Sequence, residues 1–152
     1  MVRTVLILAA IYIIYRVAKK GYDMTEDQAD IMARTIYGEA RGEGQRGMQA
    51  VANVIMNRVK AGSWYGASVK DVCLKPYQFS CWNDNDVNKL IITQATDAQL
   101  KQARKIAEQA INGTLEDITG GATHYYADSI AAPYWVASMR QTTKIGHHIF
   151  FA

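Results

Sequence analysis

Cysteine, proline and histidine are scarce in this sequence, with two, two and three copies among 152 residues. The histidines occur without an HExxH motif or the Cys/His spacing of a zinc finger, so the pattern does not predict a metal site. A Gly-x-Ser-x-Gly elbow, a Cys/His/Asn nucleophile set and a glycine-rich phosphate loop are also missing. We therefore expect no metal, no cofactor and no serine or cysteine nucleophile.

Acidic residues are absent from the first 20 positions, which hold Arg3, Arg16, Lys19 and Lys20. The whole chain has 17 basic and 14 acidic residues, a formal charge of +3. Residues 21–152 therefore keep 13 basic residues against 14 acidic ones, a net charge of −1. A nearly neutral body is atypical of nucleic-acid-binding domains, so we expect no nucleic-acid partner.

Long hydrophobic runs are rare, and residues 4–15 form the exception, with twelve uncharged residues before Arg16. A stable transmembrane helix needs about 20 apolar residues, so this run is short. A small-x-small cleavage site does not follow it. We interpret residues 1–20 as an uncleaved, weakly held segment that contacts the inner membrane through residues 4–18. The alternative is a core helix of a soluble protein, and the flanking charges alone do not orient the segment.

Helical spacing of apolar residues predicts three helices, over residues 26–37, 46–60 and 97–112. Two of them begin with capping boxes, Thr25 to Gln28 and Thr96 to Gln99. The middle helix has the clearest apolar face, formed by Met48, Val51, Ala52, Ile55 and Val59.

The segments between these helices predict the rest of the fold. Residues 21–24 resemble a short linker, residues 63–88 a long loop, and residues 120–152 a set of short strands. The length suits one domain with a real core, over residues 21–152. The sequence therefore predicts a mainly helical α+β fold, preceded by an N-terminal hydrophobic helix.

Two glutamates, Glu39 and Glu43, flank Arg41 where the first predicted helix ends in glycines. A carboxylic acid packed against apolar groups has a raised pKa and can donate a proton near neutral pH. Glu39 directly follows an apolar helical face, so it is better placed for this role than Glu43. The alternative is a solvated turn in which Arg41 pairs with either acid.

Residues 76–83 place three aromatic residues beside amide groups in an apparent loop. Flat aromatic faces with amides suit sugar rings, whereas the alternative is a hydrophobic plug under a long loop. Cys73 and Cys81 are the only cysteines. In an oxidising compartment they could form a disulfide, and in the cytoplasm they would be two free thiols.

Several blocks then occur in a distinctive order. Ala33–Glu43 and Ala50–Val59 are followed by Gln78–Asn83, Gly121–Tyr126 and Ile145–Phe151. This arrangement resembles the SleB/CwlJ family of cell-wall hydrolases over nearly the whole body. The resemblance implies a fold similar to those of lytic transglycosylases and goose-type lysozymes.

By that resemblance, Glu39 is the catalytic acid that protonates the bond between N-acetylmuramic acid and N-acetylglucosamine, then acts as a base. A lytic transglycosylase needs one carboxylate, because the 6-hydroxyl of the sugar is its nucleophile. A muramidase would use a second, with Glu43 or Asp84 as candidates. The expected peptidoglycan-binding residues are Tyr77, Phe79, Ser80, Trp82, Asn83, Thr123, His124, Tyr125 and Tyr126.

The chain departs from the spore enzymes of this family, because it lacks their wall-binding repeats and begins with the hydrophobic segment. In these respects it resembles a phage endolysin of the signal-anchor-release type. That resemblance implies a monomer tethered to the inner membrane and then released into the host periplasm. The alternatives are a membrane-tethered glycan-binding module without activity and a cytoplasmic interaction protein.

Overall fold

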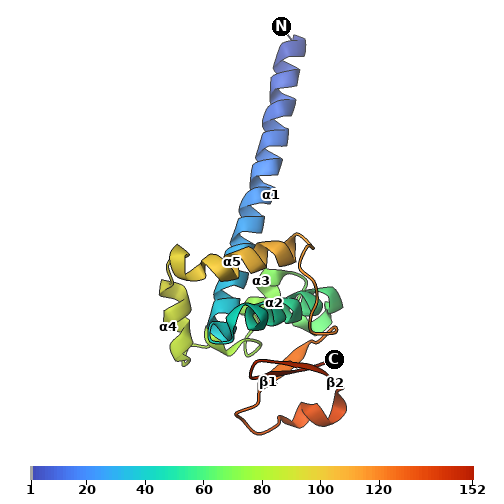
Figure 1. The fold of residues 1–152 in the computed structure, drawn as a ribbon. Helices are drawn as coiled ribbons and strands as arrows, with labels where there is room; N and C mark the ends of the chain where they lie inside the picture. Colours follow the sequence, from blue (N-terminus) through green and yellow to red (C-terminus); the bar gives the residue numbers. More distant parts are fainter. Residues whose placement is uncertain (1) are drawn as a thin grey trace.

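A long N-terminal helix leads into a helical body that carries a small sheet at the end opposite the N-terminus (Figure 1). The computed structural model describes the backbone of residues 2–152, without the side chains of residues 2–6, 9, 20–24 and 26. The helices are α1 (Val2–Ala40), α2 (Gly44–Ala61), α3 (Val69–Leu74), α4 (Val87–Gln94) and α5 (Asp97–Ile111). The strands are β1 (His124–Ala127), β2 (Gln141–Ile145) and β3 (His148–Phe151), with 3₁₀ turns η1 (Ser63–Tyr65), η2 (Ser80–Trp82) and η3 (Tyr134–Ser138). The expected mainly helical α+β class is confirmed.

The main core lies where the inner half of α1 packs against α2 and α5. Met32 and Ile36 of α1, Ile55 of α2 and Ile106 of α5 are at most 2% exposed. The predicted apolar face of α2 points into this core, with Val59 only partly buried at its edge. Apolar burial of this kind is the main stabilising term of the fold.

The structure corrects the sequence interpretation of α1. A linker at residues 21–24 and a helix start at Thr25 were predicted, but the helix is continuous from Val2 to Ala40. A single glycine, Gly21, costs a helix only about 1 kcal/mol, so it does not end one when good helix formers flank it. The hydrophobic N-terminal segment is therefore the first part of α1 and not a separate helix. No helix within the described residues is both long and apolar enough to cross a bilayer.

The long loop predicted for residues 63–88 contains η1, η2, helix α3 and the start of helix α4, and periodicity did not reveal either helix. Helix α3 has six residues, too few for an apolar period to repeat, and its start is capped by Ser68, whose Oγ accepts from Asp71 N–H at 3.1 Å. Helix α4 begins at Val87, inside the predicted loop. The predicted capping box at Thr96 and Gln99 is confirmed at the start of α5.

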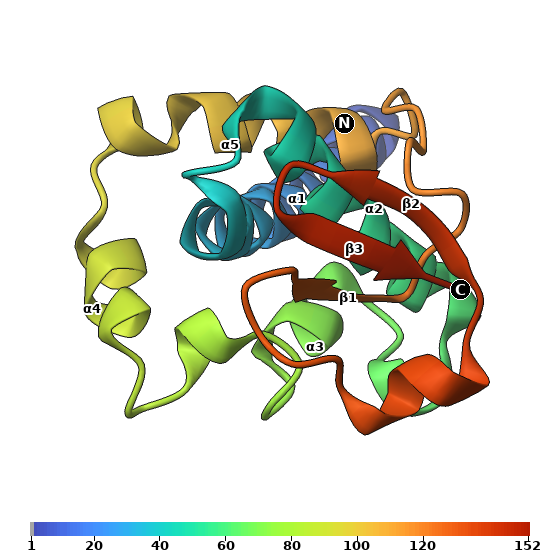
Figure 2. The same cartoon turned by 60° about the horizontal axis from the view of Figure 1, so that its bottom comes forward.

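The predicted C-terminal strands form one antiparallel sheet in the order β1-β3-β2. A tight turn at Gly146, with φ of +57°, joins β2 to β3. Ile145 and Phe150 are buried against Ala50 and Val54 of α2. Figure 2 shows the sheet lying across α2, next to the end of α1. This packing brings β1 close to the last turn of α1.

Candidate active site

Glu39 lies in the last turn of α1, and its carboxylate accepts a hydrogen bond at each oxygen. Tyr125 of β1 donates its hydroxyl to Oε2 at 2.8 Å, and the backbone N–H of Cys81 in η2 donates to Oε1 at 3.1 Å. A Cβ on Gly38 would lie 2.7 Å from Cys81 Cβ, so a glycine is needed for η2 to approach α1. Three elements distant in sequence therefore converge on one half-buried carboxylate.

Tyr125 is held as a hydrogen-bond donor to that carboxylate. Burial raises the pKa of its hydroxyl well above the usual value, and the charge of Glu39 raises it further. Its ring packs against His148 at a centroid distance of 4.9 Å and against Phe150 at 5.6 Å. The hydroxyl therefore keeps its proton and a fixed direction toward Glu39.

Thr35, one turn before Glu39, fixes the position of η2. Its hydroxyl accepts from Trp82 Nε1 at 2.8 Å and donates to the carbonyl of Ile31 at 2.8 Å. Thr35 is fully buried. The end of α1 thus carries Glu39, the catalytic candidate, and also binds the indole of Trp82.

Arg58 is a buried residue that links several segments around the site, and sequence reasoning did not identify it. Its Nε donates to the carbonyl of Thr123 at 2.8 Å and its Nη1 to Gln78 Oε1 at 3.1 Å, and its guanidinium lies 4.9 Å from the Phe79 ring centroid. Burial lowers its pKa, although the tyrosines and Glu39 nearby oppose this. Arg58 lies within the Ala50–Val59 block that carried the resemblance, and this was the available signal.

Glu43 is engaged away from Glu39. Its Oε2 accepts from the backbone N–H of His147 at 2.8 Å. A Cβ on Gly146 would lie 2.1 Å from that oxygen, and one on Gly47 would lie 2.2 Å from Glu43 Cβ. Both glycines leave room for the glutamate, which ties the β2–β3 turn to the start of α2. Arg41 donates to Asn88 Oδ1 at 2.8 Å. Among the described residues it does not pair with Glu39 or Glu43, so the alternative of a charged turn is not formed.

The predicted glycan-binding residues of the 76–83 stretch divide into two groups. Tyr77, Trp82 and Asn83 line one hollow of about 490 Å³, which also includes Asp84. Phe79 is 1% exposed and lies in the core, so its prediction as a sugar contact is wrong and the plug interpretation holds for it. Ser80 is exposed but does not line that hollow.

Asp84 does not join Glu39 either. Its side chain is 98% exposed and forms an ion pair with Lys89, which lowers its pKa. Such an exposed pair contributes little to stability.

The second predicted block, residues 123–126, forms an aromatic cluster. His124 packs against Trp135 of η3 at 5.0 Å and against Tyr65 at 6.2 Å, and burial lowers its pKa. Thr123 Oγ1 lies 3.0 Å from His124 Nδ1, and Tyr126 packs against Phe151 at 5.9 Å. Among the described side chains of residues 123–126, only that of Tyr125 forms a hydrogen bond with Glu39.

Cys73 and Cys81 are both buried free thiols, so the possible disulfide is not formed. Burial raises the pKa of Cys73 to about 12 and also raises that of Cys81. These values describe inert core thiols and not nucleophiles. Among the described residues, no cluster of histidine, cysteine and acidic side chains could hold a metal ion.

The fold and site define a mainly helical α+β domain in which the Glu39 carboxylate is hydrogen-bonded where a helix end, a 3₁₀ turn and a small sheet meet. Comparison with known proteins shows the family to which this domain belongs. The model of the Cell Wall Hydrolase family matches residues 42–151, and the chain belongs to that family. The expected membership of a cell-wall hydrolase family is confirmed. Glu39 lies just before the matched residues, whereas Glu43 lies within them.

Several relatives are spore cortex-lytic enzymes. One from Bacillus cereus is 36% identical over 130 residues, which cover 86% of this chain and 45% of that protein. One from Halalkalibacterium halodurans is 35% identical over 130 residues, covering 86% and 36%. The chain thus spans less than half the length of these relatives.

Two solved structures are also similar. The catalytic domain of Bacillus cereus SleB matches with a TM-score of 0.68 at 34% identity, covering 84% of this chain and 91% of that one. The catalytic domain of the germination-specific lytic transglycosylase SleB from Bacillus anthracis matches with a TM-score of 0.66 at 34% identity, covering 82% and 93%. The SleB-like fold predicted from the sequence is confirmed.

Proposed function

We propose that this chain cleaves the glycan strands of peptidoglycan between N-acetylmuramic acid and N-acetylglucosamine, with Glu39 as acid and base. The observation that carries this proposal is the Glu39 carboxylate held by Tyr125 and the Cys81 N–H where α1, η2 and β1 meet. The names of the relatives, spore cortex-lytic enzyme and lytic transglycosylase, support the same substrate class.

In the proposed reaction, protonated Glu39 gives its proton to the glycosidic oxygen as the bond to the muramic acid C1 breaks. The carboxylate left behind receives two hydrogen bonds, from Tyr125 and from Cys81 N–H. These donors are in place before the charge develops, so they stabilise it without reorganisation. Glu39 then removes the proton from the sugar's 6-hydroxyl, whose oxygen attacks C1 and closes a 1,6-anhydro ring.

The contacts of the other acids favour this transglycosylase over a muramidase. Glu43 is bonded to the β2–β3 turn through His147 N–H, and Asp84 is paired with Lys89 at the surface. A hydrolase that activates water would use a second carboxylate across the scissile bond. Neither acid is bonded into the arrangement around Glu39.

The test is digestion of purified peptidoglycan by the full chain and by Glu39→Gln, with mass spectrometry of the products. We expect 1,6-anhydro ends from the wild type and a loss of about 10²- to 10⁴-fold in rate for the variant. Glu108→Gln, the same change at an exposed glutamate of α5, is the matched control and should keep its activity. Reducing ends, with activity lost in Asp84→Asn or Glu43→Gln, would support the muramidase instead. Binding without any soluble product would support the non-catalytic glycan-binding module.

We also propose that the outer part of α1 tethers the enzyme to a membrane, as in an endolysin that acts from the inner membrane and then in the periplasm to lyse a host. Ile11, Ile14 and Val17 are 58–68% exposed there. Such side chains partition into a lipid interface, while Arg16 opposes deep insertion. Expression of the full chain with and without residues 2–20, followed by membrane fractionation, tests the tether.

A further inference from the structure

A ridge formed by Leu74 and Lys75, at the end of α3, separates two surface hollows. One, the Trp82 hollow, has a volume of about 490 Å³ and includes Tyr77. The other, the Trp64 hollow, has a volume of about 480 Å³ and is bounded by η1 and α3. Both ridge residues line both hollows. A ligand lying in one hollow can therefore extend over Lys75 into the other.

Lys75 differs from the other lysines that line these hollows because it lacks an acidic ion-pair partner. Lys89 in the Trp82 hollow is paired with Asp84, and Lys70 in the Trp64 hollow is paired with Asp27 at 3.1 Å. Lys75 has no acidic partner among the described residues, and its Nζ lies 4.9 Å from the Trp64 ring centroid. Asp71 also lines the Trp64 hollow, but its carboxylate accepts from the backbone N–H of Ala67 at 3.3 Å and forms no ion pair with Lys75. The ridge thus presents a lysine without an ion-pair partner beside an indole.

Trp64 is held in an exposed position by the fold. Its side chain is 59% exposed, and its ring lies 4.4 Å from that of Tyr65. The carbonyl of Tyr65 accepts from Gln78 Nε2 at 2.7 Å, and Gln78 is in turn bonded to Arg58. Trp82, in contrast, has its indole N–H bonded to Thr35. The exposed ring of Trp64 therefore lies on a fixed part of the surface and is not needed to pack the core.

The Trp82 hollow adjoins the candidate active site through the chain itself. Cys81, whose N–H donates to Glu39, directly precedes Trp82. A glycan whose cleaved bond lies at Glu39 can thus place a neighbouring sugar in this hollow. In peptidoglycan, muramic acid carries a peptide with free carboxylates and small apolar residues. That chemistry complements a cation beside an indole.

We propose that the Lys75 ridge and Trp64 bind the acidic peptide attached to muramic acid, while the Trp82 hollow holds the sugar. This inference rests on the proposed function, and it specifies the substrate as peptide-bearing glycan. The peptide carboxylate pairs with Lys75, and the apolar part of the peptide lies against Trp64. Peptide-free strands lose this contact and keep only the contacts of the sugar.

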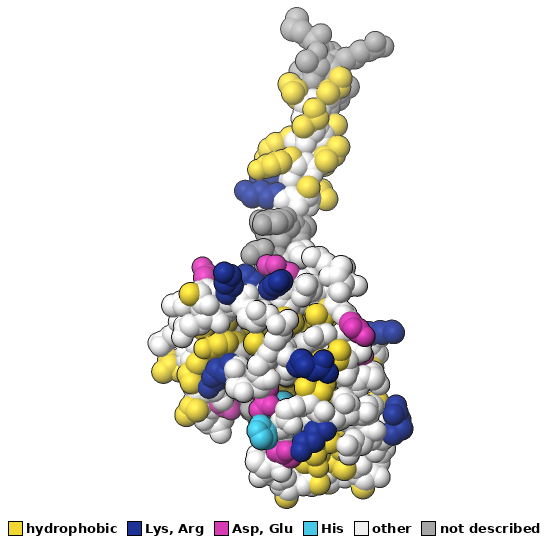
Figure 3. Space-filling view, viewed as in Figure 1, with side chains coloured by type: hydrophobic (Ala, Val, Ile, Leu, Met, Phe, Trp, Pro, Cys, Tyr) yellow, Lys and Arg dark blue, Asp and Glu magenta, His cyan; other side chains and the backbone are white. Residues whose placement is uncertain are grey.

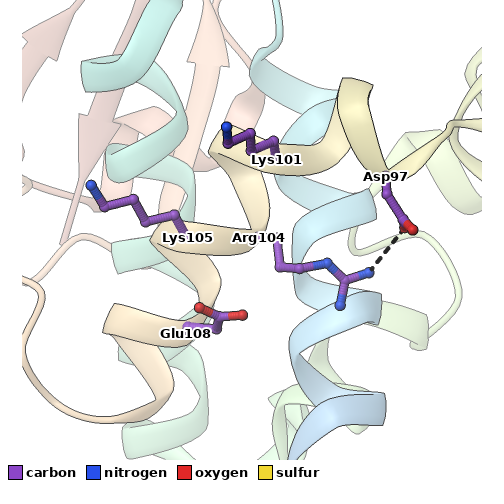
Figure 4. A pocket seen from close by; sticks show the side chains of 5 residues that line it. All are labelled: Asp97, Lys101, Arg104, Lys105 and Glu108. Carbon is purple, nitrogen blue, oxygen red and sulfur yellow. Dashed lines mark ion pairs between the residues drawn. The ribbon is translucent and has the colours of Figure 1, made fainter.

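A third hollow, of about 470 Å³ on α5, provides the matched control. It is lined by charged side chains, among them Lys101, Lys105 and Arg104, and the ion pair of Arg104 with Asp97 is drawn in Figure 4. Lys101 is exposed. Like Lys75, it forms no ion pair among the described side chains. Its hollow does not include an aromatic residue. Lys101→Gln therefore removes the same charge from a different surface.

The test measures kcat and KM of the full chain on peptidoglycan and on the same glycan after an amidase has removed its peptides. We expect the wild type to prefer the peptide-bearing strands by roughly three- to tenfold in kcat/KM, mainly through KM. Lys75→Gln should lose most of this preference, with a clearly larger loss on peptide-bearing strands than on bare strands, whereas Lys101→Gln should keep the preference. Trp64→Ala should reduce the preference in the same direction.

Two results would overturn the proposal: equal cleavage of both substrates by the wild type, or an equal loss on both in Lys75→Gln. The second would mean that Lys75 contacts the sugar. Co-sedimentation with the two substrates in a Glu39→Gln background measures binding without cleavage. If no variant cleaves but binding depends on the peptide and on Lys75, the proposed function fails and the ridge proposal stands.

Discussion

The two halves of α1 share one continuous backbone and differ in almost everything else. Residues 7–17 expose their large apolar side chains, as the yellow atoms of the upper helix in Figure 3 show, whereas residues 29–40 bury theirs against α2 and α5. Only the inner half carries Thr35 and Glu39. Apolar residues occur in both halves, so composition does not separate them. Contact with distant elements makes the inner half part of the core and of the candidate active site.

The largest expected effect comes from shortening an apolar side chain in the inner half. Met32 is fully buried, so Met32→Ala should lower the free energy of unfolding by about 2–4 kcal/mol, through lost burial and a cavity. Ile11→Ala in the outer half, where the residue is 58% exposed, should change it by less than about 0.5 kcal/mol. Chemical denaturation of both variants measures the contrast. Equal effects would show that the outer half is also packed.

Thr35→Val sharpens the comparison within the inner half, because it removes a hydroxyl and keeps the shape. Trp82 Nε1 then loses its acceptor while the turn before Glu39 stays helical. We expect a cost of about 1–3 kcal/mol in stability and a fall in kcat, since η2 also supplies the Cys81 N–H to Glu39. Thr35→Ser restores the hydroxyl and is the control. A Thr35→Val enzyme with unchanged kcat would show that η2 holds its place without this bond.

Mild acid should weaken only the end of the molecule next to Glu39. Burial lowers the pKa of His148, which lies against Tyr125, and that of His124. The unfolded chain then binds protons at a higher pH than the folded one, so this stability is complete above about pH 6.5 and is lost as the pH falls below it. The free energy of unfolding should therefore decrease as the pH is lowered from 7 to 5.

The measurement is thermal unfolding across that range, with His148→Phe as the comparison. The variant should show a smaller decrease with falling pH than the wild type. Asp117 and Asp128 have lowered pKa values, so their contribution is lost only at more acidic pH. A decrease of the same size in His148→Phe would show that His148 does not titrate in this window.

Sequence reasoning proposed Glu39 as the catalytic acid but did not give the contacts that hold its carboxylate. Glu39 was proposed because it ends an apolar helical face and lies in an ordered set of blocks. Its partners could not be found this way, because Tyr125 and Cys81 lie 86 and 42 residues away and meet it only after folding.

The errors in the fold have an equally physical origin. The linker at residues 21–24 was inferred from local signals, although helix propagation tolerates one glycine. Helix α3 is too short to show a period, and its cap at Ser68 is the only local sign of it. Phe79 was assigned to a groove because sequence does not tell a buried aromatic residue from an exposed one.

Deleting residues 2–20 should have the smallest effect on the folded body and tests the independence of the two halves most directly. The large apolar side chains described in residues 7–17 are 58–68% exposed, and Arg16 contacts Tyr12 of the same helix, so these side chains are not part of the core. We expect a change in unfolding free energy within about 0.5 kcal/mol and unchanged cleavage of soluble glycan fragments. Co-sedimentation with anionic lipid vesicles should, in contrast, be lost, because the exposed apolar side chains leave with the segment. A large drop in stability would mean that the outer half supports the core, and vesicle binding that survives the deletion would place the membrane contact on the body of the enzyme.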